Sequence, residues 1–114
     1  MTFVNEFPEF LNIPFPLEYP AISPFYSNID ITKSGSISYY ETTDEHALHR
    51  AASVVRSAFT DASDFSAKSL FVVTWNRVGK WKGDKSDDRS NEFNTFQVAI
   101  ISSGEVSYVE FLYP

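Results

Sequence analysis

One run of residues limits the fold more than any other feature of this sequence. The segment from Leu70 to Val78 reads LFVVTWNRV, which is rich in β-branched and aromatic residues. Such a run is too apolar for a strand that is wetted on one side, so it predicts a central strand covered on both faces. A chain of 114 residues provides one domain with a single core. The fold must therefore cover both faces of a sheet.

Further strand patterns lie on both sides of this run. Residues 93–101 resume strand character, residues 102–104 (SSG) form a short turn, and residues 105–113 alternate in polarity. The last two strands are therefore predicted to be a hairpin. Residues 36–41 alternate with the period of a strand that has one buried face.

One amphipathic helix is expected at about residues 43–59. Thr42 and Glu45 match the T-x-x-E capping box. Apolar residues recur at spacings of three and four, at Leu48, Ala51, Ala52, Val55 and Phe59. The polar positions fall mostly on the other side, at His46, His49, Arg50, Ser53 and Arg56. The element order, strand, helix and then three strands, predicts an α+β fold, mainly antiparallel sheet with one helix packed on it.

The first part of the chain has a different composition. Residues 1–24 hold five of the six prolines, interleaved with phenylalanines. Proline at this density prevents a helix and interrupts a central strand. We expect residues 1–23 to be an extended lead-in whose rings dock on a domain formed by residues 24–114.

The charge balance and the absence of cysteine exclude several classes of function. The chain has nine Lys and Arg and fifteen Asp and Glu, which gives a net charge of −6. It therefore has no positive field that could hold nucleic acid or an anionic membrane surface. With no Cys, disulfides, thiolate metal sites and thiol nucleophiles are all excluded. No run approaches the 18 apolar residues of a membrane span, and the first twenty residues lack the pattern of a signal peptide.

Two groups of residues have the chemistry of metal ligands. His46 and His49 are three residues apart, with Glu45 or Glu41 near enough to be a third ligand, but a histidine pair on the polar face of a helix is more often only solvated. Three carboxylates lie in the charged loop of residues 80–92, at Asp84, Asp87 and Asp88. They lack the spacing of a calcium loop and alternate with Lys and Arg. We therefore predict no metal and no cofactor.

No motif supports an enzyme. Glu110 shares a predicted strand face with Tyr108 and Leu112, and Asp30 lies in a largely apolar segment. Both are expected to be structural groups that accept hydrogen bonds rather than an acid and base pair. No nucleophile elbow or phosphate-binding loop is present in a chain with four glycines.

The remaining candidates are aromatic surface residues. Tyr39 and Tyr40 are adjacent, so in a strand they point to opposite faces and one of them is a candidate for exposure. Trp75 lies in the most apolar strand and belongs to the core. Trp81, at the edge of the charged loop, is either a surface anchor or a cap on the end of the sheet.

Several segments together resemble the nidogen-like domain, NIDO. They are PFYSNIDI (24–31), GSISYYET (35–42), HRAASVVRSAF (49–59), VVTWNRVG (72–79), NTFQVAI (94–100) and YVEFLYP (108–114). The most specific pieces are T-W-x-x-V-G and N-T-F-Q, separated by a polar loop. The family occurs in nidogen, alpha-tectorin and the large membrane mucin.

The resemblance implies a non-catalytic extracellular module associated with cell–matrix adhesion and matrix assembly. It also implies that the motif residues are structural: Thr74, Trp75, Val78 and Gly79 in a central strand, and Asn94, Thr95, Phe96 and Gln97 at the start of its partner strand. Implied partners are extracellular matrix or cell-surface proteins. Two departures stand out: position 80 is Lys where the family usually has an aromatic residue, and the family's domain usually begins earlier. We therefore expect a piece of a larger secreted or membrane-anchored protein, with the domain incomplete at its N-terminus.

Two other hypotheses compete with an adhesion module. A carbohydrate-binding β-domain would use exposed Tyr and Trp, with Tyr40 and Trp81 as the candidate contact residues. A hydrolase would rest on Asp30 or Glu110 and has only generic support.

Overall fold

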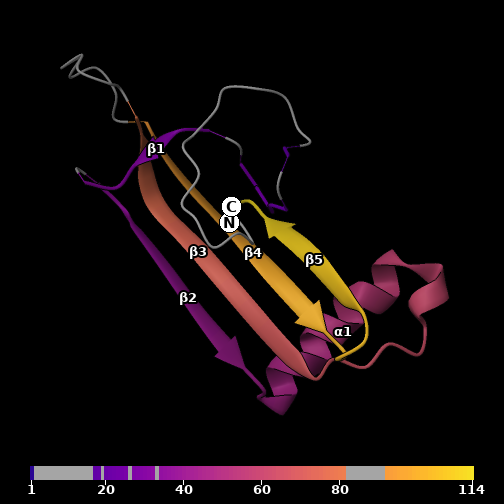
Figure 1. Ribbon diagram of the computed structural model, residues 1–114. Coiled ribbons are helices and arrows are strands. Elements are labelled where there is room, and N and C mark those ends of the chain that lie inside the picture. The colour runs from indigo at the N-terminus through magenta and orange to yellow at the C-terminus, as the bar shows by residue number, and fades with distance from the viewer. Residues whose placement is uncertain (2–16, 19, 26, 33, 82–91) are drawn as a thin grey trace.

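The computed structural model describes residues 1, 17–18, 20–25, 27–32, 34–81 and 92–114, in which a helix lies across one face of an antiparallel sheet (Figure 1). The strands are β1 (Ile29–Asp30), β2 (Ser36–Thr42), β3 (Ser69–Lys80), β4 (Phe93–Ser102) and β5 (Ser107–Leu112). Helix α1 (Glu45–Ala58) and the short 3-10 helix η1 (Thr60–Ala62) connect β2 to β3. The predicted α+β class is confirmed.

Strand β3 is the centre of the sheet. One of its edges pairs with β2 over residues 70–76 and with β1 at residues 79–80, and its other edge pairs with β4. Strand β5 pairs with β4 as the predicted hairpin, and all four pairings are antiparallel. Because β2 and β5 each pair with one neighbour among the described residues, they form the two edges of the sheet.

Helix α1 covers one face of the sheet. We call it the helix face; it carries the side chains of even-numbered residues in β2 and β3 up to Thr74 and of odd-numbered residues in β4. Ala51, Ala52 and Val55 of α1 are buried together with residues of β3 and β4. The sheet contributes Leu70, Val72, Ala99 and Ile101 to this cluster. Tyr108 of β5 packs edge-on against Phe65, with ring centroids 5.0 Å apart.

The opposite face has its own core. Val73, Trp75, Val78, Phe96 and Val98 are buried there, with Met1 and Ile22 packed against them. Part of the lead-in thus covers this face, and Met1 and Ile22 exchange hydrogen bonds of 2.8 and 2.9 Å. Just after the lead-in, the Phe25 ring lies 5.7 Å from that of Phe96. The prediction that the central strand is covered on both faces is confirmed. The phenylalanines of residues 1–23 lie outside the described residues.

A β-bulge interrupts the pairing of β3 with β4 between Trp75 and Val78. Arg77 has a positive φ of 52°, and its N–H donates to Thr95 Oγ1 over 3.0 Å. Gly35, with φ of 82°, lies against this bulge, and a Cβ atom added to it would be 2.4 Å from the Arg77 carbonyl oxygen. Gly35 therefore lets the turn between β1 and β2 approach the bulge.

The predicted capping box is wrong. Thr42 still pairs with Leu70 at the end of β2, so it cannot be the N-cap. Asp44 takes that place, and its side chain accepts a hydrogen bond from Ala47 N–H over 3.1 Å. The helix begins at Glu45 and ends at Ala58, because Phe59 has an extended backbone. Thr42 contributes to the turn before the helix, where its Oγ1 accepts a hydrogen bond from the N–H of Asp44.

Strand β2 also differs from the prediction of one buried face. Residues 36–41 are all exposed, because β2 is an edge strand and α1 crosses the sheet over β3 and β4. Tyr39 and Tyr40 do point to opposite faces, and both are exposed.

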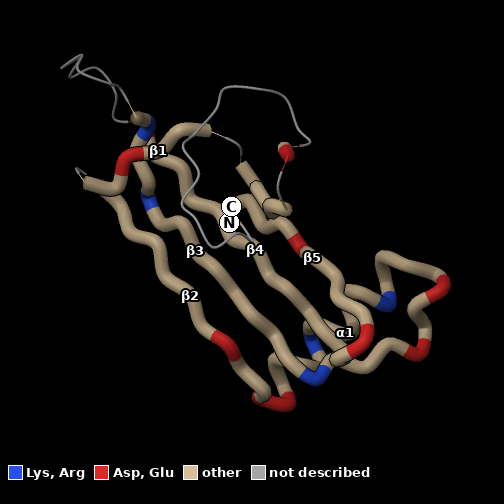
Figure 2. The backbone as a smooth tube through the Cα atoms, in the orientation of Figure 1, with Lys and Arg blue, Asp and Glu red and all other residues tan. Residues whose placement is uncertain are grey.

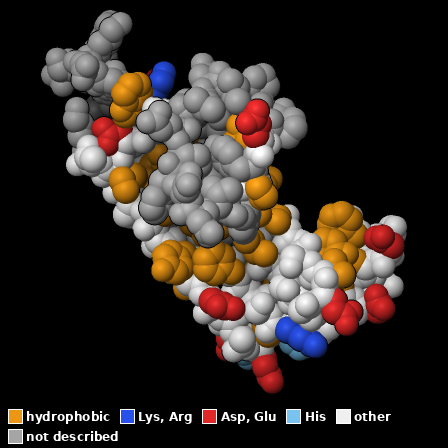
Figure 3. Space-filling view, viewed as in Figure 1, with side chains coloured by type: hydrophobic (Ala, Val, Ile, Leu, Met, Phe, Trp, Pro, Cys, Tyr) orange, Lys and Arg blue, Asp and Glu red, His pale blue; other side chains and the backbone are white. Residues whose placement is uncertain are grey.

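Charged and apolar side chains are separated over the described surface. Apart from Glu110 within β5, charged residues lie at or near the strand ends, in the turns and on the helix, and the middle of β3 and β4 carries none (Figure 2). Hydrophobic side chains gather on the sheet face opposite α1 (Figure 3). Those that stay exposed there include Tyr39, Val109 and Phe111.

Candidate functional site

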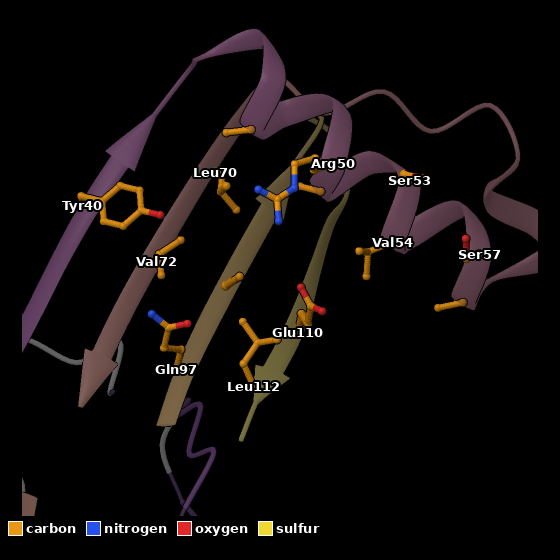
Figure 4. Close-up of a pocket in the computed structure, with 14 residues that line it drawn as sticks. Tyr40, Arg50, Ser53, Val54, Ser57, Leu70, Val72, Gln97, Glu110 and Leu112 are labelled. Carbon is orange, nitrogen blue, oxygen red and sulfur yellow. The ribbon is translucent and has the colours of Figure 1, made fainter. Parts of the chain in front are cut away.

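A groove of about 780 Å³ runs between α1 and the helix face of the sheet (Figure 4). It crosses the sheet from Tyr40 on β2 to Glu110 and Leu112 on β5. Val72 of β3 and Ala99 of β4, both buried, form its floor. An apolar depression with a few polar groups at its rim is typical of a binding site.

One side of α1 forms the first wall. The lining residues of the helix are Ala47, Arg50, Ala51, Ser53, Val54, Ser57 and Ala58. They recur at spacings of three and four, so they share one side of the helix. The sequence predicts that Arg50 and Ser53 lie mostly on the polar side of the helix; both are exposed, and both also border the groove. The sequence could have indicated their place beside the groove, because in the helical pattern they adjoin Ala47, Ala51 and Val54.

Strand residues form the second wall, and a hydrogen bond fixes one of them. Thr74 and Gln97 face each other across β3 and β4, and Gln97 Nε2 donates to Thr74 Oγ1 over 2.8 Å. Gln97 keeps its Oε1 and one amide hydrogen for other partners. Thr74 therefore orients Gln97 beside the groove.

Two opposite charges point into the groove. Arg50 extends from α1 toward the sheet, and Glu110 points from β5 toward the helix (Figure 4). Within the described part of the chain neither side chain has a hydrogen bond or an ion pair. Glu110 shares its strand face with Tyr108 and Leu112, as predicted, because these residues pair with Ala99, Ile101 and Gln97.

The two candidate surface aromatics are far apart. Tyr40 is 55% exposed and lines the groove. Trp81 is 52% exposed and follows β3, where its N–H donates to the Asn28 carbonyl. Tyr40 pairs with Val72, nine residues before Trp81, which is roughly 30 Å along the strand. The two rings therefore cannot share one ligand of ordinary size.

The family-motif residues meet across β3 and β4. Trp75 stacks on Phe96, with ring centroids 5.0 Å apart and an interplanar angle of 19°. The other pairs are Thr74 with Gln97, Val78 with Asn94, and Gly79 with Phe93. Thr95 accepts the hydrogen bond from the bulge at Arg77. The motif thus joins the core on one face to the groove on the other.

The candidate catalytic and metal residues do not converge. Asp30 Oδ1 accepts hydrogen bonds from Thr32 N–H and Oγ1, at 2.8 and 2.6 Å. Asp30 lies on β1 and Glu110 on β5, three strand spacings or roughly 14 Å apart across the sheet. Paired carboxylates of glycosidases are at most about 9.5 Å apart. The structure therefore gives no support to a hydrolase built on these two residues.

The histidine pair lies on the exposed side of α1. His49 borders a second cavity of about 270 Å³, together with Glu45 and Arg56. Among the described residues no group of three or more His, Asp or Glu side chains is placed to hold a metal ion. Asp84, Asp87 and Asp88 lie outside the described residues. In the same described part, no helix is long and apolar enough to cross a membrane.

Comparison with known proteins identifies the class. The model of the nidogen-like domain family, NIDO, matches residues 1–114, and the chain belongs to this family. Nidogen of Drosophila melanogaster is 45% identical over 117 residues, which is all of this chain and 8% of the relative. Nidogen-2 of Mus musculus is 37% identical over 93% of this chain and 8% of the relative. Alpha-tectorin of Homo sapiens is 33% identical over 81% of this chain and 4% of the relative.

These relatives are structural proteins of the extracellular matrix. The chain spans less than a tenth of the length of each of them. No solved structure gives a significant match. The predicted family is confirmed, and the chain is a domain of the type found in matrix proteins.

Proposed function

We propose that this chain is a non-catalytic module of an extracellular protein and acts in cell–matrix adhesion and matrix assembly through protein–protein contacts. Membership in the family of nidogens and alpha-tectorin carries the proposal. The groove between α1 and the sheet supplies a surface on which a partner can be held. The partners are extracellular matrix or cell-surface proteins.

The arrangement of charges supports binding rather than turnover. Among the described residues that line the groove, Glu110 is the one carboxylate, whereas acid and base catalysis on a glycoside needs two. The net charge of −6 favours encounters with basic surfaces over polyanionic ones. Family membership supports an extracellular location, with the chain working as one part of a longer secreted or membrane-anchored protein.

A deletion tests the module directly. Fluorescently labelled full-length protein, and the same protein without this segment, are incubated with matrix laid down by cultured cells. The bound fluorescence of the deleted form should fall to the level of an unrelated control protein. Equal binding by the two forms would show that this segment takes no part in matrix attachment.

A second candidate function is carbohydrate binding, which the exposed ring of Tyr40 at one end of the groove favours. Aromatic rings stack on sugar faces, and planar polar side chains bind sugar hydroxyls. A glycan array probed with the chain and with Tyr40→Ala and Trp81→Ala variants tests this function. Binding that survives both substitutions would exclude it.

A further inference from the structure

We propose that the groove binds an extended peptide segment of about four residues, with an acidic side chain that meets Arg50, a basic side chain that meets Glu110, and aliphatic side chains that pack on the floor of the groove. This inference rests on the proposed function, because it names the kind of partner segment that the groove accepts. Shape, charge and the orientation of Gln97 support it.

The length and floor of the groove match an extended chain. From Tyr40 to Glu110 the groove crosses β2, β3, β4 and β5, which are three spacings of about 4.8 Å, or roughly 14 Å. An extended peptide rises about 3.3 Å per residue, so about four residues span this distance. The aliphatic side chains of Val72, Ala99 and Leu112 offer apolar contact along the way.

The two charged groups of the groove determine which charges the ligand must carry. Arg50 and Glu110 face the same groove, and within the described residues each lacks a partner. A guanidinium accepts a carboxylate through two parallel hydrogen bonds, and a carboxylate accepts an ammonium or a guanidinium. A ligand that carries both signs satisfies both groups, whereas a ligand of one sign leaves one of them opposed or unpaired.

Gln97 favours a peptide over a sugar. Its hydrogen bond to Thr74 fixes the amide, which still offers one acceptor, Oε1, and one N–H donor. A peptide group presents the complementary pair, one N–H and one C=O. Together with an aliphatic floor rather than an aromatic one, this amide matches a polypeptide backbone. Thr74 acts as a positioning residue, since it holds Gln97.

A peptide library tests the proposal without a known partner. The full chain is immobilised and used to select from phage-displayed random heptapeptides. We expect enriched peptides that hold an acidic and a basic residue at a fixed separation and in a fixed order, together with aliphatic residues. The double variant Arg50→Glu/Glu110→Arg should select the same spacing in the opposite charge order.

Synthetic copies of the enriched peptide then measure each contact. Arg50→Ala, Glu110→Ala and Gln97→Ala should each weaken binding about tenfold or more, since a hydrogen bond to a charged or fixed group is lost. Thr74→Val should weaken binding less than Gln97→Ala does. Lys80→Ala and Glu105→Ala are the matched controls, because both residues are exposed and lie outside the groove.

Three outcomes would overturn the proposal. They are the absence of an enriched charge pattern, an enriched pattern that the charge swap leaves in the same order, and binding of glycans at the groove in place of peptides. The deletion experiment separates this failure from that of the proposed function. If deletion abolishes matrix attachment while the selection fails, the peptide inference is wrong and the module stands. If attachment survives deletion, the proposed function is wrong.

Discussion

Replacement of Val98 by alanine tests whether the sheet face opposite α1 is a true core. Val98 is fully buried, at 0% exposure, among Val73, Trp75 and Phe96. Loss of two methyl groups costs about 1.6 kcal/mol at about 0.8 kcal/mol each. A residual cavity of roughly 40 Å³ adds about 1 kcal/mol at about 24 cal/mol per Å³. We expect the free energy of unfolding to fall by about 2.5 kcal/mol and the Tm by roughly 10 °C.

Val109→Ala is the matched control. Val109 belongs to the same face, one row from Val98 and on the neighbouring strand, but it is 42% exposed. Its replacement should change the free energy of unfolding by less than about 0.5 kcal/mol. Urea titrations followed by tryptophan fluorescence and by circular dichroism measure both variants and check that the two signals coincide. If the two variants differ by less than about 0.5 kcal/mol, the lead-in does not cover this face.

Three further predictions concern local features. Asp44→Ala should lower the free energy of unfolding by about 1 kcal/mol and Asp44→Asn by much less, because Asn also caps; equal losses in urea titrations would contradict the cap. Gly35→Ala should cost more than Gly104→Ala, since both have positive φ but only Gly35 would clash, at 2.4 Å from Arg77 O against 3.9 Å from a Lys68 side-chain carbon for Gly104; the reverse order would refute the close approach. Burial lowers the pKa of the Met1 amino group below its usual 8.0, so the unfolded chain holds this proton to higher pH. Stability should therefore rise with pH between the folded pKa and about 8, and acetylation of the amine should abolish this rise, as thermal unfolding at several pH values would reveal.

The central strand and its partners were predictable because they follow simple periodicities. The apolar run at residues 70–78 indicated cover on both faces, and the structure has a helix on one side and lead-in residues on the other. The hairpin of β4 and β5 followed from a segment with strand character and an alternating segment, joined by a turn with Gly104. In each case local pattern and global packing agree.

The features that could not be predicted from the sequence depend on tertiary structure. Thr42 satisfies the capping pattern, but its pairing with Leu70 keeps it in the sheet, so Asp44 caps the helix. Alternation in β2 predicted a buried face, yet the position of β2 at the sheet edge leaves residues 36–41 exposed. Arg50 is exposed on the polar side, as the helical pattern indicates, but its place beside the groove was not predictable. A helical pattern gives the angular position of a residue around the helix axis but not the width of the neighbouring sheet.

The positions of the family-motif residues at the groove were also only partly predictable from the sequence. Trp75 and Phe96 were expected in paired strands, and they stack in the core. No pattern in the sequence predicted that Thr74 would orient Gln97 on the opposite face, beside Arg50 and Glu110. The register of β3 with β4 sets Thr74 opposite Gln97, the register of β4 with β5 places Glu110, and the packing of α1 on the sheet adds Arg50.

The central claim is that the groove holds the protein partner of this matrix module. The most direct test compares two doubly substituted forms of the full-length protein in binding to cell-laid matrix: Arg50→Ala/Glu110→Ala in the groove, and Lys80→Ala/Glu105→Ala outside it. Both forms lose one positive and one negative charge, so the net charge of the protein is unchanged. We predict that the groove variant binds at least about tenfold more weakly and that the control binds like the unmodified protein. Equal binding by the two variants would contradict the claim.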